Sequence, residues 1–171
     1  REFEPGFEFA KKLDRDDPLA SYHDRFVITD PALMYMDGNS LGRLPKQSSR
    51  LADDLVHRQW GERLIRGWGE GWFDAPERVG AKIAKLIGAR PDEVILADST
   101  SVNLFKLVVA SLGFQNSRKT IVTDNLNFPS DLYILQGAAS LLNQGHKIAM
   151  CESDDGIHGP ASEIKQALSR D

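Results

Sequence analysis

The sequence has one cysteine, no long apolar run and no excess of positive charge, and each absence narrows the possible classes of protein. Cys151 cannot form an internal disulfide, which favours a reducing, cytoplasmic compartment and a role as a small buried hydrophobe. No apolar segment reaches the length of a membrane-spanning helix, so no membrane partner is expected. A formal net charge of -4 gives no electrostatic reason to bind nucleic acid.

Motifs for several common chemistries are also missing. The four histidines share no ligand spacing with one another or with Cys151, so no metal site is predicted. No serine lies in a nucleophile elbow, and no Walker loop is present. The glycine-rich run at 67–71 follows a predicted helix where a dinucleotide loop requires a strand, which disfavours a Rossmann oxidoreductase.

The second half of the chain alternates short apolar strands with helices. We predict strands at 94–97, 119–123 and 147–151, followed by helices at about 101–112, 129–143 and 160–169. Short strands that are apolar throughout indicate a mostly parallel sheet with helices on both faces, and therefore an α/β fold.

The first half is predicted to be mostly helical. Residues 1–44 are expected to form an amino-terminal arm with one or two short helices, and residues 45–171 to form a larger domain. After Pro45, apolar side chains recur with the 3.6-residue period of a helix, which predicts a buried stripe. Its members are Leu51, Leu55, Val56, Trp60 and Leu64.

The strongest chemical signal is the polar turn at 98–101, between the first predicted strand and its helix. The first turn of a helix has unpaired backbone N–H groups and partial positive charge. At the carboxyl end of a strand, and with the hydroxyls of Ser99, Thr100 and Ser101, it would suit a phosphate. The alternative is that these three residues only cap the helix.

A second loop, at 124–131, follows the next predicted strand. Phe128 precedes Pro129 and is therefore confined to extended conformations, so its ring could present a face to a flat ligand. Asp131 lies at the start of the following helix, where a carboxylate is favoured. A simple capping role for Asp131 is the alternative.

Four motifs together resemble the kynureninase family in order and approximate spacing. They are Gly-Asn-Ser-Leu-Gly at 38–42, the segment at 66–71, Asp-Ser-Thr-Ser-Val-Asn-Leu at 98–104, and Phe-Pro-Ser-Asp at 128–131. The resemblance covers the amino-terminal part of an enzyme well over twice as long. It implies a pyridoxal-phosphate enzyme of the aspartate aminotransferase-like fold (fold type I). Such an enzyme cleaves kynurenine hydrolytically to anthranilate and alanine in tryptophan catabolism.

The resemblance also assigns residues. It implies that the cofactor site comprises Thr100 and Ser101 at the phosphate, Phe128 stacked on the pyridine ring, and Pro129, Ser130 and Asp131. Ser40 and Trp68 would line the aryl end of the substrate. Trp68 stands where animal members carry histidine, which implies a preference for kynurenine over 3-hydroxykynurenine.

The family's Schiff-base lysine lies beyond residue 171, so the resemblance places no catalytic residue in this chain. The chain alone is expected to hold cofactor without catalysing the reaction. The resemblance further suggests a homodimer. The alternatives are another fold-type-I pyridoxal-phosphate enzyme, such as a cysteine desulfurase-like protein, and a non-catalytic domain that retains the fold.

Overall fold

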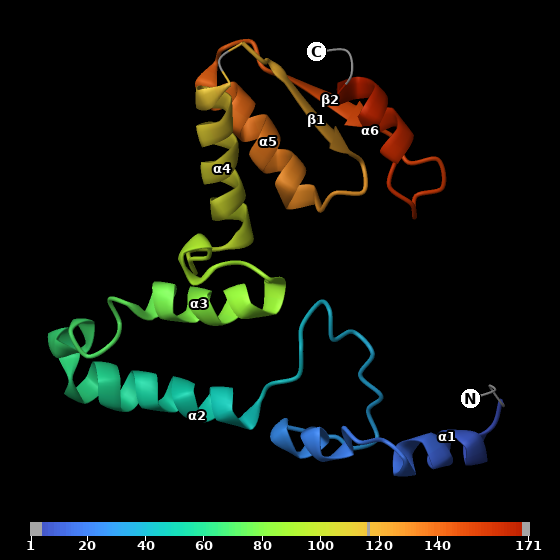
Figure 1. The fold of residues 1–171 in the computed structure, drawn as a ribbon, viewed down its shortest axis with the longest axis vertical. Coiled ribbons are helices and arrows are strands. Elements are labelled where there is room, and N and C mark those ends of the chain that lie inside the picture. The colour runs from blue at the N-terminus through green and yellow to red at the C-terminus, as the bar shows by residue number, and fades with distance from the viewer. Residues whose placement is uncertain (1–4, 116, 169–171) are drawn as a thin grey trace. The chain divides into compact units, whose positions relative to one another are not determined.

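The computed structural model describes residues 5–115 and 117–168 of the chain (Figure 1). Contacts between residues divide it into two units, Arg1–Ala75 and Pro76–Asp171.

The first unit is built from helices of three kinds. Two short helices of the predicted arm are present, α1 (Phe7–Arg15) and the 3₁₀ helix η1 (Ala20–Arg25). An antiparallel bridge joins Phe26 to Pro45. The chain then continues as α2 (Lys46–Asp54), the π-helix η2 (Leu55–Glu62) and the 3₁₀ helix η3 (Leu64–Trp68).

The apolar stripe after Pro45 is exposed, so the prediction that it is buried is wrong. Its members are between 46% and 65% exposed (Leu51, Leu55, Val56, Trp60 and Leu64). Periodicity identifies the apolar face of a helix, but burial also requires an element that packs against that face. No described element of the first unit covers this stripe.

The second unit contains the predicted alternation of strands and helices. Its elements are α3 (Ala75–Ile87, which begins at the last residue of the first unit), η4 (Pro91–Glu93), α4 (Thr100–Phe114), β1 (Thr120–Asp124), α5 (Pro129–Leu142), β2 (Lys147–Cys151) and α6 (Ala161–Leu168). The end of the last predicted helix, at Ser169, lies outside the described residues.

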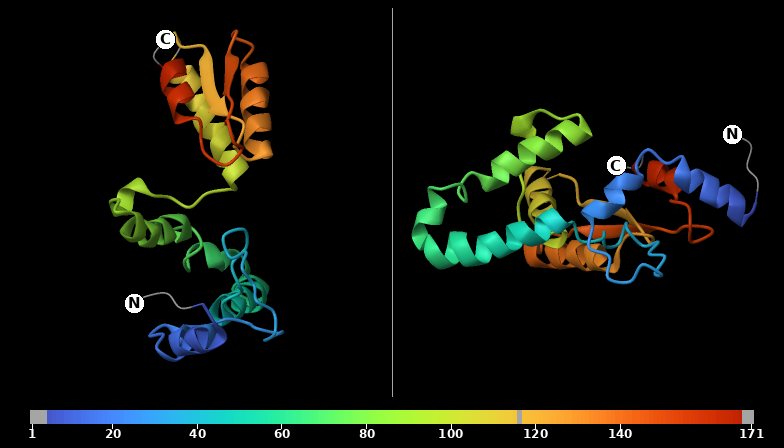
Figure 2. Two further views of the ribbon diagram at one scale, coloured as in Figure 1. Left: turned by 90° about the vertical axis from the view of Figure 1, so that its right-hand side faces the viewer. Right: turned by 90° about the horizontal axis from the view of Figure 1, so that it is seen from below.

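A two-stranded parallel sheet lies at the centre of the second unit. β1 and β2 pair in register from Thr120 opposite Lys147 to Asp124 opposite Cys151. α5 and α6 lie on opposite faces of the sheet, and α4 packs against α5 (Figures 1 and 2). The parallel sheet with helices on both faces is therefore confirmed, on a smaller scale than predicted.

The described core of this unit is small. Thr123 of β1, Leu135 and Ala138 of α5, and Cys151 of β2 are buried. Cys151 thus takes the role of a small buried hydrophobe, as predicted. Ala84 of α3 is also fully buried.

Residues 94–97 do not form the predicted strand. Val94 has extended backbone angles, but among the described residues no strand pairs with this segment. Instead, the Leu96 N–H donates to the Pro76 carbonyl at 3.2 Å, and the Ala97 carbonyl accepts from Asn103 Nδ2 at 2.8 Å. An extended apolar segment becomes a strand only beside a partner strand, and sequence alone does not supply that partner.

The amino ends of α4 and α5 and the carboxyl end of β1 lie at the same end of the second unit (Figure 1). Pro129 is the first residue of α5, a position that needs no backbone N–H. Asn143 ends α5 in the left-handed conformation, at φ 47°. These local signals set the two ends of α5 and therefore the point at which the loop at 124–131 enters the helix.

Close packing at Gly80 provides a test of the second unit. A Cβ atom at Gly80 would lie 2.1 Å from the Val94 carbonyl oxygen, which is a backbone atom. We expect Gly80→Ala to lower the free energy of unfolding by about 1–3 kcal/mol, because α3 or the 94–97 segment must move. The measurement is urea unfolding of the protein.

Gly113→Ala is the matched control, since nothing lies within 4 Å of a Cβ placed there in α4. It should be neutral or stabilising by up to about 1 kcal/mol because alanine favours a helix. Equal stability of the two variants would contradict the packing of α3 against residues 94–95.

Candidate cofactor and aryl-binding sites

The turn before α4 leaves the first residues of the helix available for an anion. Ser99 is the N-cap, and its Oγ accepts the Val102 N–H at 3.4 Å. Asp98 adopts a positive φ of 33° and forms an ion pair with Lys106. Because Ser99 caps the helix, the hydroxyls of Thr100 and Ser101 are not needed as caps.

The loop before α5 holds Phe128 at the N-cap position. Its side chain is 73% exposed, and its backbone is extended with ψ 136°, as expected before proline. The Asp131 N–H donates to the Phe128 carbonyl at 2.8 Å, and Ser130 Oγ lies 3.4 Å from Asp131 Oδ1. The first turn of α5 therefore places one carboxylate and one exposed ring at its amino end.

Asn125 fixes this loop to the segment that follows β2. Its Nδ2 donates to Glu152 Oε2 at 2.6 Å, and its Oδ1 accepts the Ser153 N–H at 3.0 Å. The Asn125 N–H also donates to the Cys151 carbonyl at 3.1 Å. Asn125 was not among the predicted site residues, although a polar side chain directly after a strand is a usable signal.

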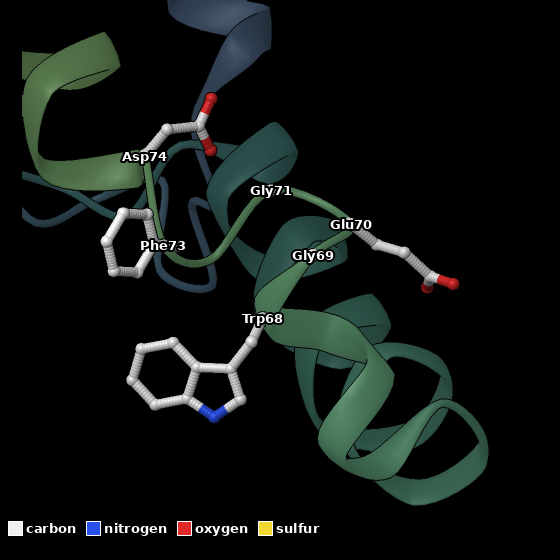
Figure 3. Close-up of a pocket in the computed structure, with 6 residues that line it drawn as sticks. All are labelled: Trp68, Gly69, Glu70, Gly71, Phe73 and Asp74. Atoms are coloured by element: carbon white, nitrogen blue, oxygen red, sulfur yellow. The ribbon is translucent and has the colours of Figure 1, made fainter.

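In the first unit, a pocket of about 670 Å³ lies at the glycine-rich loop after η3. It is lined by Trp68, Gly69, Glu70, Gly71, Phe73 and Asp74. Figure 3 shows the rings of Trp68 and Phe73 on the same side of the loop, while Glu70 extends to the opposite side. Trp68 is the predicted aryl-site residue, and Phe73, which lines the same pocket, was not predicted.

Hydrogen bonds hold the second tryptophan of this loop. Trp72 Nε1 donates to Gln59 Oε1 at 2.8 Å, and Gln59 Nε2 donates to Asp54 Oδ2 at 2.7 Å. Arg58 donates to both oxygens of Asp54, at 2.6 and 2.8 Å. The rings of Trp68 and Trp72 are 6.4 Å apart in an edge-to-face arrangement.

Two carboxylates of this region are paired with arginines. Hydrogen bonds from Arg58 and then Gln59 lower the pKa of the Asp54 carboxyl from its ordinary 3.8 to about 2. Arg63 donates two hydrogen bonds to Glu70 and lowers the pKa of that carboxyl. Both carboxylates therefore stay ionised at neutral pH.

Ser40 lies in a different loop of the first unit. Its Oγ donates to Asp37 Oδ1 at 2.7 Å, and the Tyr35 hydroxyl donates to the Leu41 carbonyl at 2.6 Å. These bonds shape the predicted Gly38–Gly42 turn. The residues that line the pocket do not include Ser40, so the pocket does not unite it with Trp68.

Asp155 and His158 form a local pair after β2. His158 Nδ1 lies 2.6 Å from Asp155 Oδ2, and the backbone N–H of His158 is the main cause of a lowered pKa at Asp155. Within residues 5–115 and 117–168, no group of three potential ligand side chains could hold a metal ion. No described helix is both long and apolar enough to cross a membrane.

This chain is similar to known proteins over most of its length. No model of a protein family matches it. It is 44% identical over 151 residues to "Kynureninase" from Burkholderia mallei (strain SAVP1), which covers 85% of this chain and 36% of that protein. It is 40% identical over 164 residues to "Kynureninase" from Pseudomonas fluorescens, covering 93% of this chain and 38% of that protein. Over the matched region, the chain belongs to the kynureninase family.

The chain thus spans less than two-fifths of the length of the curated kynureninases that it matches. Membership of the family confirms the resemblance that the four motifs carried.

The low pKa of Asp54 predicts an acid transition in the first unit. Because the folded-state pKa lies below the ordinary value, the charged carboxylate stabilises the fold above about pH 4. This stabilisation is lost as the pH falls from 3.8 to about 2. We expect the near-ultraviolet circular dichroism of the tryptophans to change in that interval.

Asp54→Asn should lack this step, and the same substitution at the neighbouring exposed Asp53 should retain it. An identical transition in the wild type and in Asp54→Asn would show that Asp54 does not hold the tryptophan loop.

Proposed function

We propose that this chain is the cofactor- and aryl-binding part of a pyridoxal-phosphate-dependent kynureninase. The complete protein would cleave L-kynurenine hydrolytically to anthranilate and L-alanine, and 3-hydroxykynurenine less well. The 40–44% identity to kynureninases is the observation that carries the proposal. The starts of α4 and α5 and the Trp68 pocket support it.

The donor set at the start of α4 fits a phosphate. Thr100 and Ser101 each offer a hydroxyl and a backbone N–H in the first turn, and the helix dipole adds partial positive charge. Ser99 satisfies the N–H of Val102. The N–H groups of the first two helical residues therefore remain for the anion.

The loop at 124–131 would hold the flat part of the cofactor. The exposed ring of Phe128 offers a stacking surface, and Asp131 offers a carboxylate for a protonated pyridine nitrogen. Pro129 and the Asn125 bonds would keep this loop in place. When bound, pyridoxal phosphate supplies an electron sink for carbon–carbon cleavage.

The residues of this chain bind and orient in this proposal and do not transfer protons. Thr100 and Ser101 would hold the phosphate, and Trp68 would contact the aryl ring of the substrate. The lysine that the family needs would come from the remaining length of the protein. We further propose a homodimer, as the resemblance suggests, and a cytoplasmic location, as the single cysteine favours.

Phosphate binding by the α4 turn can be measured in the full-length protein. We expect Thr100→Ala and Ser101→Ala each to weaken pyridoxal phosphate binding about 10- to 100-fold, because each removes a hydrogen bond to a charged group. The readout is titration of the visible absorption band of the bound cofactor.

Ser111→Ala, at the opposite end of α4, removes the same hydroxyl and should leave the affinity unchanged. An affinity that is the same in all three variants would refute the assignment of the phosphate to this turn.

Substrate choice tests the role of Trp68. We expect the full-length wild type to have a higher kcat/KM for kynurenine than for 3-hydroxykynurenine. Trp68→His should shift that ratio towards the hydroxylated substrate by about tenfold, since a nitrogen would face the added hydroxyl. Equal selectivity in the two proteins would contradict the role given to Trp68.

A further inference from the structure

Trp68 is a poor anchor for a ligand by itself. Its side chain is 54% exposed, and it lies at the last residue of the short helix η3. An exposed ring on a loop loses rotational freedom when a ligand binds, and this loss weakens binding. A ring that the protein already holds in place avoids that loss.

Trp72 is the neighbour that can hold it. The two rings meet edge to face at 6.4 Å, with 74° between their planes. Trp72 lies flat against Gly67, where a Cβ atom would come within 2.9 Å of three of its ring atoms. Its backbone N–H donates to the Gly67 carbonyl at 3.1 Å. Trp72 is therefore fixed on one side by backbone.

Gln59 fixes the other side of Trp72. It accepts the indole N–H at 2.8 Å and donates to Asp54 at 2.7 Å, so both ends of its amide are used. The amide orientation is thereby determined, because Asp54 can only accept and the indole can only donate. Arg58 completes the chain by holding both oxygens of Asp54.

The π-helix η2 makes this arrangement possible. Asp54 receives hydrogen bonds from residues four and five positions later, Arg58 and Gln59. In a regular α-helix, positions three and four apart share a face, and position five does not. The wider turn, seen in the bond from Arg63 N–H to the Arg58 carbonyl at 3.0 Å, brings both side chains to one carboxylate.

We infer that Gln59 and Trp72 are positioning residues that hold Trp68 in the orientation in which it receives the aryl ring of the substrate. This inference rests on the proposed function for its substrate, but its geometry is independent of that function. The π-helix lets Gln59 reach Asp54. The contacts from Gln59 to Trp72 and from Trp72 to Trp68 then fix one wall of the pocket.

The test uses the full-length protein with the substitutions Gln59→Leu, Gln59→Glu and Trp72→Phe, and Gln47→Leu as the matched control. Gln47 is an exposed glutamine on α2. Gln59→Leu removes the acceptor of the indole N–H, whereas Gln59→Glu keeps an acceptor oxygen. Exciton-coupled circular dichroism of the Trp68–Trp72 pair, identified as the signal lost in Trp68→Phe, reports the geometry directly.

We expect Gln59→Leu to reduce the exciton signal and to raise KM for kynurenine about two- to tenfold with little change in kcat. Gln59→Glu should restore only part of the signal and of KM, because it returns an acceptor to the indole N–H but places a second carboxylate beside Asp54. Gln47→Leu should match the wild type. Adding Gln59→Leu to Trp72→Phe should raise KM little further, because both remove the same bond.

An exciton signal and a KM in Gln59→Leu equal to those of Gln47→Leu would overturn the inference. Additive effects of Gln59→Leu and Trp72→Phe on KM would also overturn it. If Gln59→Leu does not fold, the KM of Trp72→Phe decides, and a value equal to that of the wild type would overturn the inference. A wild type that does not cleave kynurenine would refute the proposed function, while the exciton measurements would still test the positioning role.

Discussion

The second unit depends on a simple constraint: the first turn of a helix leaves backbone N–H groups that need partners. α4 and α5 both begin at the end of the unit where β1 ends (Figure 1). Parallel pairing of β1 with β2 brings the segment after β2 to the same end. There Asn125 joins the loop after β1 to the segment after β2. Unpaired donors, an exposed ring and a carboxylate are therefore gathered by backbone topology before any ligand is considered.

Backbone irregularities border both candidate sites. Asp98, with φ 33°, precedes the start of α4, and Leu64, with φ 52°, is the first residue of η3 after the π-helix. Non-glycine residues with a positive φ are strained and often lie beside functional sites. Near Leu64, the same irregular stretch directs Gln59 towards Trp72 and so stiffens the loop that carries Trp68. In both places, an unfavourable local conformation accompanies an ordered set of polar side chains.

The sequence predicted features that depend on neighbouring residues better than features that depend on distant partners. The start of α5 at Pro129 and the strands β1 and β2 follow from local signals, and the structure contains them. The strand at 94–97 and the buried stripe on α2 and η2 required a partner that periodicity cannot supply. The Gln59–Trp72 bond spans thirteen residues and an unpredicted π-helix, so no local pattern announced it. Family motifs indicated Trp68 but not the residues that hold it.

The central claim is that the amino end of α4 binds the phosphate of pyridoxal phosphate, and phosphorus NMR of the full-length protein with bound cofactor tests it most directly. A phosphate held by helix N–H groups and two hydroxyls should remain a dianion. Its resonance should then not shift with pH through about 6, where a free phosphate monoester takes up its second proton. A resonance that titrates like the free ester would contradict the account.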